Sequence, residues 1–498
     1  MKNLTVKTKK IDCSQANSAQ KFQTETDWFT FSQNSFLFFR KDQKNSLKKG
    51  KMSTSIHPNN VRSTLGRHML TDGLDLVLDL KKSKGAYLHD SATGIDYLDF
   101  FTFFASNPLG MNHDRLAGDP DFVAKLGQVA INKPSNSDVY TQEMAEFLDT
   151  FSRVGIPDYM PYAFFVSGGA LAVANALKVA FDWKVQKNFR KGYRTEKGHK
   201  VLHLDKAFHG RSGYTLSLTN TEPNKIKYFP KFDWPRIHNP AIQFPLNEES
   251  TQKVIVEEEQ AIAQARRYFE MYEDDIACIL LEPIQGEGGD NHFRVEFHRA
   301  LRELADEFDA LFIYDEVQTG VGLTGKFWAH EYYVKPDILA FGKKAQVCGI
   351  LASERIDEIE TNCFHVSSRI NSTWGGNLVD MVRFQRILEV IEEDKLVDHA
   401  YQTGAYLQQK LVELFDELEH ITNPRGKGLF CAIDLPDTQA RDAVRKACIK
   451  NRMMILGCGT KSIRFRPALT IQKEQIDEAI DILKRSYWEV FENNPVSV

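Results

Sequence analysis

FRVEFHRALRELADEFDALFIYDE, residues 293–316, is the clearest indication of the fold. Residues 293–308 place apolar side chains three or four positions apart, which is typical of an amphipathic helix. Residues 310–316, ALFIYDE, form a short apolar run that ends in two acids, as a buried strand does. A helix that leads directly into a buried strand is the repeating unit of a parallel sheet with helices on both faces.

The same alternation continues on both sides of this unit. Short apolar runs at 162–166, 200–204, 276–281 and 337–341 predict further strands, and ALAVANALKVAFDW (170–183) predicts a helix after a Gly-Gly turn. A hairpin is predicted at 86–101. A long helix from Leu378 to about His420 leads to a tail with strands at 428–435 and 462–469. We therefore expect an α/β fold: a large, mostly parallel sheet flanked by helices, and a smaller α/β domain.

Composition and charge describe an ordinary globular protein. Hydrophobic residues make up 42% and charged residues 26% of the chain, and the net charge of −4 gives no reason to expect nucleic acid or an anionic membrane as a partner. No apolar run approaches the roughly 20 residues that span a bilayer. The seven cysteines are scattered without a CxxC pair, which predicts reduced thiols in the cytoplasm and no zinc site.

Two segments depart from the pattern. Residues 1–51 are rich in Lys, Ser, Gln and Asn, and we expect a disordered extension that could lie upstream of a natural start at Met52. In FPKFDWPRIHNPAIQFP (229–245) a proline recurs every five residues, which favours an irregular loop over strand or helix. This loop either lies on the surface or packs on a partner subunit, because its aromatic side chains need cover.

Polar and small residues collect where the predicted strands end. Ligands of open parallel sheets bind beyond the carboxyl ends of the strands. An aldehyde cofactor on a heterocycle needs a lysine amine, a carboxylate beside its ring nitrogen, and backbone amides at a helix start for its phosphate. Lys343, Asp315 and the turn at 168–170 would supply these groups, although most lysines in proteins are simply solvated.

Several stretches resemble the class-III pyridoxal-phosphate-dependent aminotransferases, which act on terminal amines. They are LEPIQGEGG (281–289), LFIYDEVQTGVGLTGKFWAHE (311–331), PDILAFGKK (336–344), STWGGNLVDM (372–381) and IRFRPALT (463–470). The resemblance covers Met52 to the C-terminus and implies a fold-type I PLP-dependent transferase that acts as a cytoplasmic homodimer with composite active sites. It implies a small domain built from 52–110 and 378–498, the latter including a linking helix, and a large cofactor-binding domain at 111–377.

The resemblance also implies a role for each cofactor-binding residue. Lys343 matches the Schiff-base lysine, and Lys344 is then a structural neighbour. Asp315 matches the partner of the ring nitrogen. The other matches are Gln318 near the ring oxygen, Phe208 stacked on the ring, Gly169 and Ala170 in the phosphate-binding turn, and Thr373 as a phosphate ligand from the other subunit, with Asn371 close by.

A transaminase handles two substrates at one site, and the resemblance implies how their carboxylates are told apart. Arg211 and Arg464 match two carboxylate-binding arginines, and Glu287 matches a glutamate that covers Arg464 in the first half-reaction and leaves it in the second. The alternative for Arg464 is an exposed strand arginine like Arg466. Stretches at 164–184, 207–237 and 342–352 are most similar to members that move the ε-amine of L-lysine to 2-oxoglutarate, and 4-aminobutyrate or ornithine is the alternative donor.

Two other classes of protein fit the sequence less well. A nucleotide-binding dehydrogenase would share the sheet, but no GxGxxG follows the first strand. A metal hydrolase could use His292, Glu296 and His298, but their spacing matches no helical ligand pair, and they are expected on the polar face of a helix. We therefore expect no metal.

Overall fold

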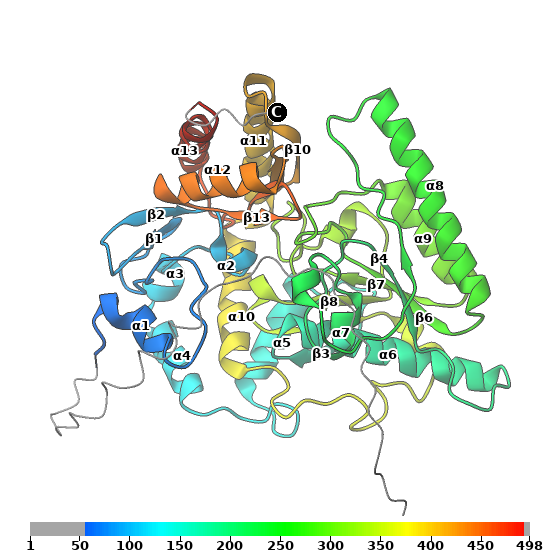
Figure 1. Ribbon diagram of the computed structural model, residues 1–498. Helices are drawn as coiled ribbons and strands as arrows, with labels where there is room; N and C mark the ends of the chain where they lie inside the picture. Colours follow the sequence, from blue (N-terminus) through cyan, green and yellow to red (C-terminus); the bar gives the residue numbers. More distant parts are fainter. Residues whose placement is uncertain (1–54, 493–498) are drawn as a thin grey trace, which may run out of the picture. The chain divides into compact units, whose positions relative to one another are not determined.

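The computed structural model describes residues 55–492, so the expected extension over 1–51 lies outside the described residues. The chain divides into two units, Met1–Val61 and Arg62–Val498. In the described part of the first unit, the 3₁₀ turn η2 (Pro58–Asn60) follows His57, and the helix α1 (Val61–Leu65) begins where this unit ends. The second unit holds all the strands that the structure describes (Figure 1).

The larger sheet of the second unit has seven strands in the order β3-β9-β8-β7-β6-β4-β5. Neighbouring strands run parallel except β9, which is antiparallel to both β3 and β8. The five predicted strands are confirmed, whereas β9 and the two-residue β5 were not predicted. The bounds are β3 (Tyr162–Val166), β4 (Lys200–Leu204), β5 (Arg236–Ile237), β6 (Ile276–Leu281), β7 (Leu311–Asp315), β8 (Ile338–Phe341) and β9 (Cys348–Ala352).

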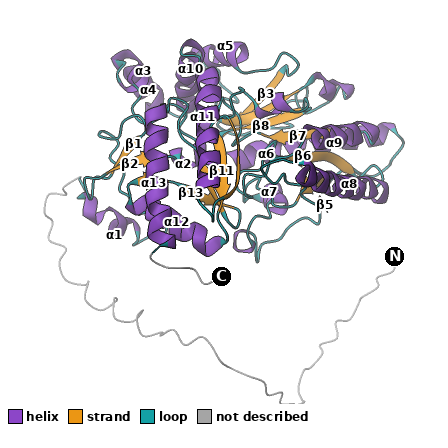
Figure 2. Cartoon of the chain, turned by 90° about the horizontal axis from the view of Figure 1, so that it is seen from above, coloured by secondary structure: helices purple, strands orange, loops and turns teal. Residues whose placement is uncertain are grey.

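Helices cover both faces of this sheet, as predicted (Figures 1 and 2). Successive side chains of a strand point to opposite faces. Ile313 of β7 therefore packs with α6 (Gly169–Arg190), while Phe312 packs on the other face with α9 (Val295–Glu307). The remaining helices around the sheet are α5 (Gln142–Val154), α7 (Gly213–Leu218), α8 (Glu248–Met271) and α10 (Leu378–Glu393).

Segments from the two ends of the second unit pair in a smaller α/β part. The predicted hairpin is confirmed as β1 and β2, and β12 from the C-terminal tail pairs with β2 in parallel. A four-stranded antiparallel sheet, in the order β10-β11-β14-β13, lies beside it. The bounds are β1 (Tyr87–His89), β2 (Asp96–Asp99), β10 (Thr422–Lys427), β11 (Phe430–Asp434), β12 (Met453–Met454), β13 (Leu456–Cys458) and β14 (Ser462–Phe465).

The long helix predicted from Leu378 to about His420 is two helices. α10 ends at Glu393 and α11 (Leu396–Glu417) begins after Lys395, whose φ of +51° lies in the left-handed region and breaks the helix. Residues 428–435 and 462–469 contain β11 and β14, as predicted. The other helices are α2 (Thr102–Ala105), α3 (Asp114–Ala117), α4 (Pro120–Ile131), α12 (Thr438–Lys450) and α13 (Lys473–Phe491).

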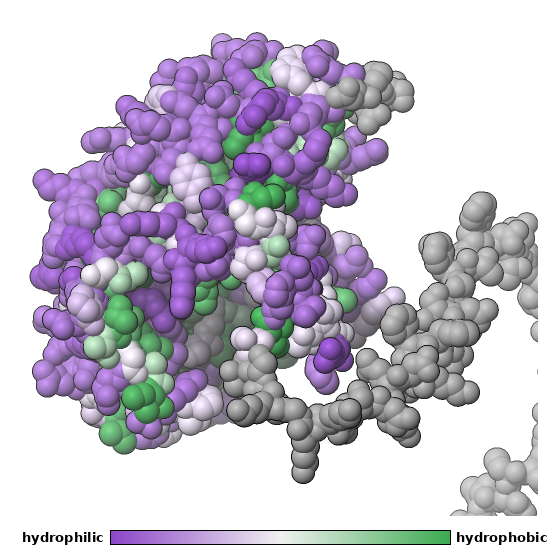
Figure 3. Space-filling model, turned by 90° about the vertical axis from the view of Figure 1, so that its left-hand side faces the viewer, coloured by the Kyte–Doolittle hydropathy of each residue, from purple (hydrophilic) through white to green (hydrophobic). Residues whose placement is uncertain are grey.

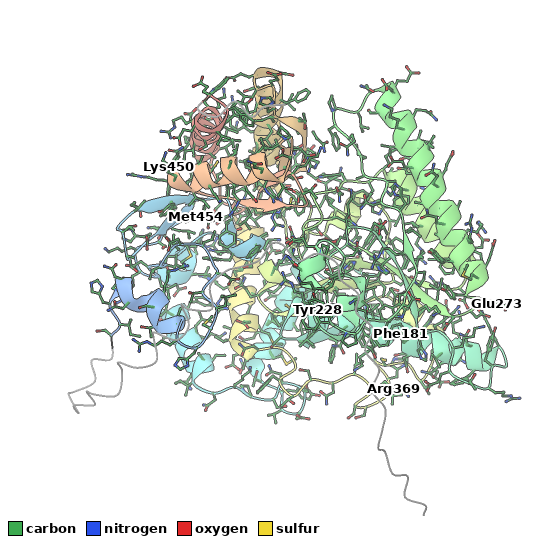
Figure 4. The ribbon with its side chains drawn as sticks, in the orientation of Figure 1. Phe181, Tyr228, Glu273, Arg369, Lys450 and Met454 are labelled. Carbon is green, nitrogen blue, oxygen red and sulfur yellow. The ribbon has the colours of Figure 1, made fainter. Side chains whose placement is uncertain are left out.

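The proline-rich segment at 221–247 is mostly irregular, as predicted. It contains only the 3₁₀ turn η3 (Pro223–Lys225) and β5. Tyr228, labelled in Figure 4, is 92% exposed, and Phe229 and Phe232 are also exposed. Some of its aromatic residues are therefore left open to solvent in the single chain.

No helix within residues 55–492 is long and apolar enough to cross a membrane. The described cysteines, which exclude Cys13, are free and buried. Burial keeps these thiols from water, and burial raises the pKa of Cys278 above its ordinary value. No cluster of metal-ligating side chains occurs among the described residues.

Candidate active site

Lys343 occupies the turn where the chain reverses from β8 to β9. Its φ of +50° is left-handed, and the 3₁₀ turn η5 (Lys343–Ala345) follows Gly342. A Cβ on Gly342 would lie 2.8 Å from Cys348 Sγ, so glycine is needed for the two strands to come this close. Burial and then the charge of Arg464 lower the pKa of Lys343 to about 8, against the opposite pull of nearby acids. A larger fraction of its amine is thus neutral near pH 7 than in a solvated lysine.

Lys344 has different surroundings from its neighbour. Its side chain is almost fully buried, and its Nζ donates hydrogen bonds to Ala105 O at 3.2 Å and Gln318 O at 2.7 Å. Lys343 instead lines a cavity of about 200 Å³ beyond the carboxyl ends of the strands. The amine of Lys343 therefore faces a cavity, whereas the amine of Lys344 links two backbone segments by hydrogen bonds.

Asp315 ends β7 on the wall of the same cavity. The carboxylate is 6% exposed, and its Oδ2 lies 2.8 Å from His209 Nδ1. His209 Nε2 has no hydrogen-bond partner among the described residues. With a proton on Nδ1, the His209 ring donates a hydrogen bond to the carboxylate and fixes its direction.

The start of α6 forms another wall. β3 ends at Val166, Gly168 adopts a φ of +120°, and α6 begins at Gly169. A Cβ on Gly169 would lie 3.0 Å from Val317 Cγ1, so the backbone closely approaches the segment that follows β7. Backbone amides at the start of a long helix are free to bind an anion, which the helix dipole also favours.

Glu282 fixes the turn that carries Phe208. Its Oε1 accepts a hydrogen bond from Phe208 N and its Oε2 one from Gly286 N, each at 3.0 Å. Burial raises the pKa of this carboxyl to about 7. Phe208 lines the cavity, and Arg211 lies 5.8 Å from its ring with a solvent-exposed side chain.

Glu287 lies between two cations, one of which is Arg464 of β14 in the four-stranded sheet. Its Oε2 is 2.8 Å from Arg464 Nη2, and its Oε1 is 2.7 Å from Lys225 Nζ. Burial alone would raise the pKa of Glu287, but Arg464 and Lys225 together lower it to about 2. The pair is therefore ionised at any working pH.

The expectation that Arg466 is an exposed strand arginine is wrong. Arg464 and Arg466 are 3% and 1% exposed. Arg466 forms an ion pair with Asp290 Oδ1 at 2.5 Å and donates to Gln318 Oε1 at 3.2 Å. This arginine is held by protein groups, because a charge this deeply buried needs partners.

Residues 102–105 form a left-handed turn beside Arg464. Every φ from Thr102 to Ala105 lies between +39° and +64°, a conformation that costs roughly 1–2 kcal/mol for each residue. The turn is held by Asp99 Oδ1, which accepts from Thr102 N at 2.7 Å. It places the half-exposed Phe104 ring 5.7 Å from the Arg464 guanidinium.

Not all the predicted site residues come together in the single chain. Gly169, Ala170, Phe208, Asp315, Gln318 and Lys343 line one cavity. Asn371 lines a different groove of about 900 Å³, and Thr373 is exposed, with its carbonyl accepting a hydrogen bond from Ser135 Oγ. Their roles stay predictions.

The structure adds four residues that the sequence did not single out for a role. They are His209 on Asp315, Glu282 under the Phe208 turn, Lys225 on Glu287, and Phe104 beside Arg464. His209 adjoins Phe208 and Glu282 follows the strand at 276–281, so their positions beyond strand ends indicate a cofactor site, although not their individual roles. Nothing in the sequence indicates that Lys225 reaches Glu287 across 62 residues.

The expectation that His292, Glu296 and His298 form a polar helix face is wrong for both histidines. His292 is 3% exposed and precedes α9, and His298 is fully buried, with Nδ1 2.7 Å from the hydroxyl of Tyr314. Burial lowers the pKa of His298 to about 3, so this ring is a neutral core group.

A comparison with protein families identifies the fold and the site together. The family model for class-III aminotransferases matches residues 71–486, which include every residue of the cavity. The chain belongs to the class-III aminotransferases. These enzymes depend on pyridoxal 5′-phosphate.

Curated relatives of this aminotransferase cover most of its length. An L-lysine-epsilon aminotransferase of Mycobacterium tuberculosis is 55% identical over 85% of this chain and 94% of its own. One from Streptomyces clavuligerus is 50% identical over 88% and 96%. A probable mitochondrial 4-aminobutyrate aminotransferase of Caenorhabditis elegans is more distant, at 31% over 82% and 87%.

Solved structures agree with the fold of this aminotransferase. The lysine aminotransferase of M. tuberculosis in the internal aldimine form has a TM-score of 0.85 and 54% identity, covering 86% of this chain and 99% of that one. The α/β fold with a mixed, mostly parallel sheet is therefore that of a fold-type I PLP-dependent enzyme.

The cavity of this aminotransferase fits the cofactor of its family. A buried carboxylate, Asp315, faces the cavity with a histidine behind it. Helix α6 presents its amides at Gly169, where any larger residue would press on Val317. These groups suit a protonated ring nitrogen and a phosphate, and Lys343 offers an amine beside them.

Proposed function

We propose that this aminotransferase moves the ε-amine of L-lysine to 2-oxoglutarate, giving L-glutamate and (S)-2-amino-6-oxohexanoate. The product would cyclise to 1-piperideine-6-carboxylate, because its own α-amine can reach the new aldehyde. The observation that carries the proposal is the ion pair between Glu287 and Arg464, which covers a carboxylate-binding group until it is needed. The relatives named above that are at least 50% identical carry the lysine activity in their names.

The cofactor-binding roles follow from the cavity walls. When bound, pyridoxal 5′-phosphate supplies an aldehyde that condenses with amines and a ring that draws electrons from the substrate carbon. Asp315, held by His209, would keep the ring nitrogen protonated. Gly169 and Ala170 would bind the phosphate through backbone amides, Phe208 would cover the ring, and Gln318 would lie at its edge.

Lys343 would act as the acid–base group. Its Nζ would accept the proton that leaves the carbon bearing the donated amine. The lowered pKa of about 8 favours this step, since a neutral amine can accept a proton and a solvated ammonium cannot.

The arginines would orient the two substrates. With lysine, Glu287 neutralises Arg464, so the α-carboxylate binds at a distance, on Arg211, and the ε-amine reaches Lys343. With glutamate or 2-oxoglutarate, Glu287 leaves and Arg464 binds the carboxylate beside the reacting carbon. Arg211 suits its role because it forms no ion pair with any residue from 55 to 492.

The alternative donors are 4-aminobutyrate and ornithine. Product analysis distinguishes lysine from these donors. Purified enzyme is incubated with 2-oxoglutarate and each amine in turn, and glutamate and the cyclic imine are measured directly. We expect lysine to give both products and 4-aminobutyrate to give little glutamate. Equal glutamate formation from 4-aminobutyrate would reject the lysine assignment. A dehydrogenase is not supported, because the chain belongs to the aminotransferase family.

A homodimer with composite active sites is part of the proposal. Thr373 and Asn371 lie apart from the cavity on an exposed segment, where they could serve the phosphate and substrate of a partner subunit. The exposed aromatic side chains of the segment at 221–247 supply apolar area of the kind that interfaces bury. Figure 3 shows further apolar patches on an otherwise hydrophilic face.

The remaining assignments concern organisation and place. We propose a small domain formed by 52–110 and 378–498, around the two sheets that join the chain ends, and a large domain at 111–377. We also propose a cytoplasmic location, which suits the free cysteines of the described residues.

A further inference from the structure

Lys225 is a cation near the site to which neither the sequence nor the proposed chemistry gives a role. It ends the short turn η3, and its side chain is only 10% exposed. Its Nζ lies 2.7 Å from Glu287 Oε1 and 2.7 Å from Glu222 Oε1, and 5.5 Å from the Phe208 ring. Lys225 therefore connects the segment at 221–247, to which it belongs, with Glu287 beside the cavity.

The two oxygens of Glu287 are divided between two cations. Oε2 belongs to Arg464 and Oε1 to Lys225. Glu287 can therefore give up Arg464 without losing its other ion pair. Arg464 is 3% exposed and Glu287 22%, so both charges are substantially removed from water and neither is stable without a partner.

We propose that Lys225 is a positioning residue that holds Glu287 when the carboxylate leaves Arg464 to a substrate carboxylate. In the covered state, the Glu287 carboxylate is shared between Arg464 and Lys225 and partly neutralises the charge of each. In the open state, the substrate carboxylate pairs with Arg464, and Glu287 stays paired with Lys225. Every buried charge keeps a partner in both states, so the exchange between the two substrates has a low energetic cost.

The inference rests on the proposed function and predicts an asymmetric effect. Without Lys225, the open state leaves Glu287 unpaired, whereas the covered state retains the pair with Arg464. Loss of Lys225 should weaken every ligand that must open the pair, namely glutamate, 2-oxoglutarate and glutarate. The lysine half-reaction should remain, because it uses the covered state.

The test compares Lys225→Met with Lys225→Arg in the holoenzyme. Lys227→Met is the matched control, since Lys227 lies on the same segment, is exposed, and contacts the Tyr228 ring instead of an acid. Titration with glutarate, a dicarboxylate without amine or keto group, measures opening of the pair without any reaction. Stopped-flow half-reactions with lysine and with glutamate give the concentration dependence and the maximal rate of each.

For Lys225→Met we expect glutarate and glutamate to bind about tenfold more weakly, as the loss of one charge-assisted hydrogen bond implies. The maximal glutamate rate and the whole lysine half-reaction should stay at the level of the control. Lys225→Arg should restore most of the dicarboxylate affinity.

Three results would overturn the inference: unchanged glutarate affinity, equal losses in both half-reactions at an unchanged melting temperature, or weaker lysine binding alone. The last result would make Lys225 a direct ligand of the lysine carboxylate. The glutarate titration does not depend on the amino donor. If the wild-type enzyme prefers another donor, the proposed substrate is wrong. The glutarate titration still tests the role of Lys225 in that case.

Discussion

Arg464 Nη2 lies 2.8 Å from Glu287 Oε2, and the guanidinium is almost completely buried. A buried arginine with one removable carboxylate is suited to bind two kinds of ligand in turn. The pKa of Glu287, lowered to about 2, means that pH does not open the pair in the working range, so a ligand must do so.

Removing either partner should affect the two half-reactions in opposite ways. Glu287→Ala should slow the lysine half-reaction, since a free Arg464 attracts the α-carboxylate, and should retain or improve the glutamate half-reaction. Arg464→Ala should weaken 2-oxoglutarate most, by about 2–5 kcal/mol for a desolvated charge pair. Single-turnover kinetics with each substrate measure both, and a parallel decline in the two half-reactions would contradict the account.

The adjacent lysines should differ sharply. Lys343→Ala should abolish turnover and the pH-dependent visible spectrum. Lys344→Met should keep the spectrum but lower the free energy of unfolding by about 1–3 kcal/mol, because it leaves the carbonyls of Ala105 and Gln318 without a buried donor. Absorbance and urea denaturation separate the two effects, and the reverse pattern would move the catalytic role to Lys344.

The rate at which apoenzyme captures pyridoxal 5′-phosphate should depend on pH. The pKa of Lys343 is lowered to about 8, so the neutral amine becomes the major form only above that pH. Capture should therefore rise between about pH 7 and 9 and then level off, whereas an ordinary lysine would continue to gain up to its usual pKa of about 10.4. Stopped-flow absorbance after a pH jump measures the profile, and a midpoint near the ordinary value would contradict the burial argument.

Composite sites can be tested by complementation. Mixing Lys343→Ala chains with Thr373→Val chains should restore activity, because a heterodimer would contain one site with both native residues. The mixture is compared with each variant alone after subunit exchange. Analytical ultracentrifugation supplies the second check, and a fully active monomer would refute the shared site.

Much of the fold could be predicted from local pattern. The strands at 276–281 and 310–316 are apolar runs with flanking helices, so periodicity alone located them. No helix precedes β9, because the chain reverses directly at the left-handed Lys343, so the alternation of helix and strand did not indicate this strand or its antiparallel direction. The break at Lys395 escaped prediction for the same reason.

The site was predictable where residues follow a strand end and not where they arrive from distant loops. Asp315 and Lys343 adjoin strands, so topology places them at one edge. Lys225 and Phe104 reach Glu287 and Arg464 from short turns whose paths depend on tertiary packing. Arg466 was misjudged because its charge is neutralised by Asp290, a residue far away in sequence.

The most direct test of the central claim is the rate at which the bound cofactor is converted from its pyridoxal to its pyridoxamine form by single amines. Stopped-flow absorbance with lysine, ornithine and 4-aminobutyrate at equal concentrations gives this rate without interference from the acceptor. We expect the fastest conversion with L-lysine, because Glu287 covers Arg464 and Arg211 offers a carboxylate site farther from Lys343. Faster conversion with 4-aminobutyrate or ornithine would contradict the lysine assignment and leave only the class of reaction standing.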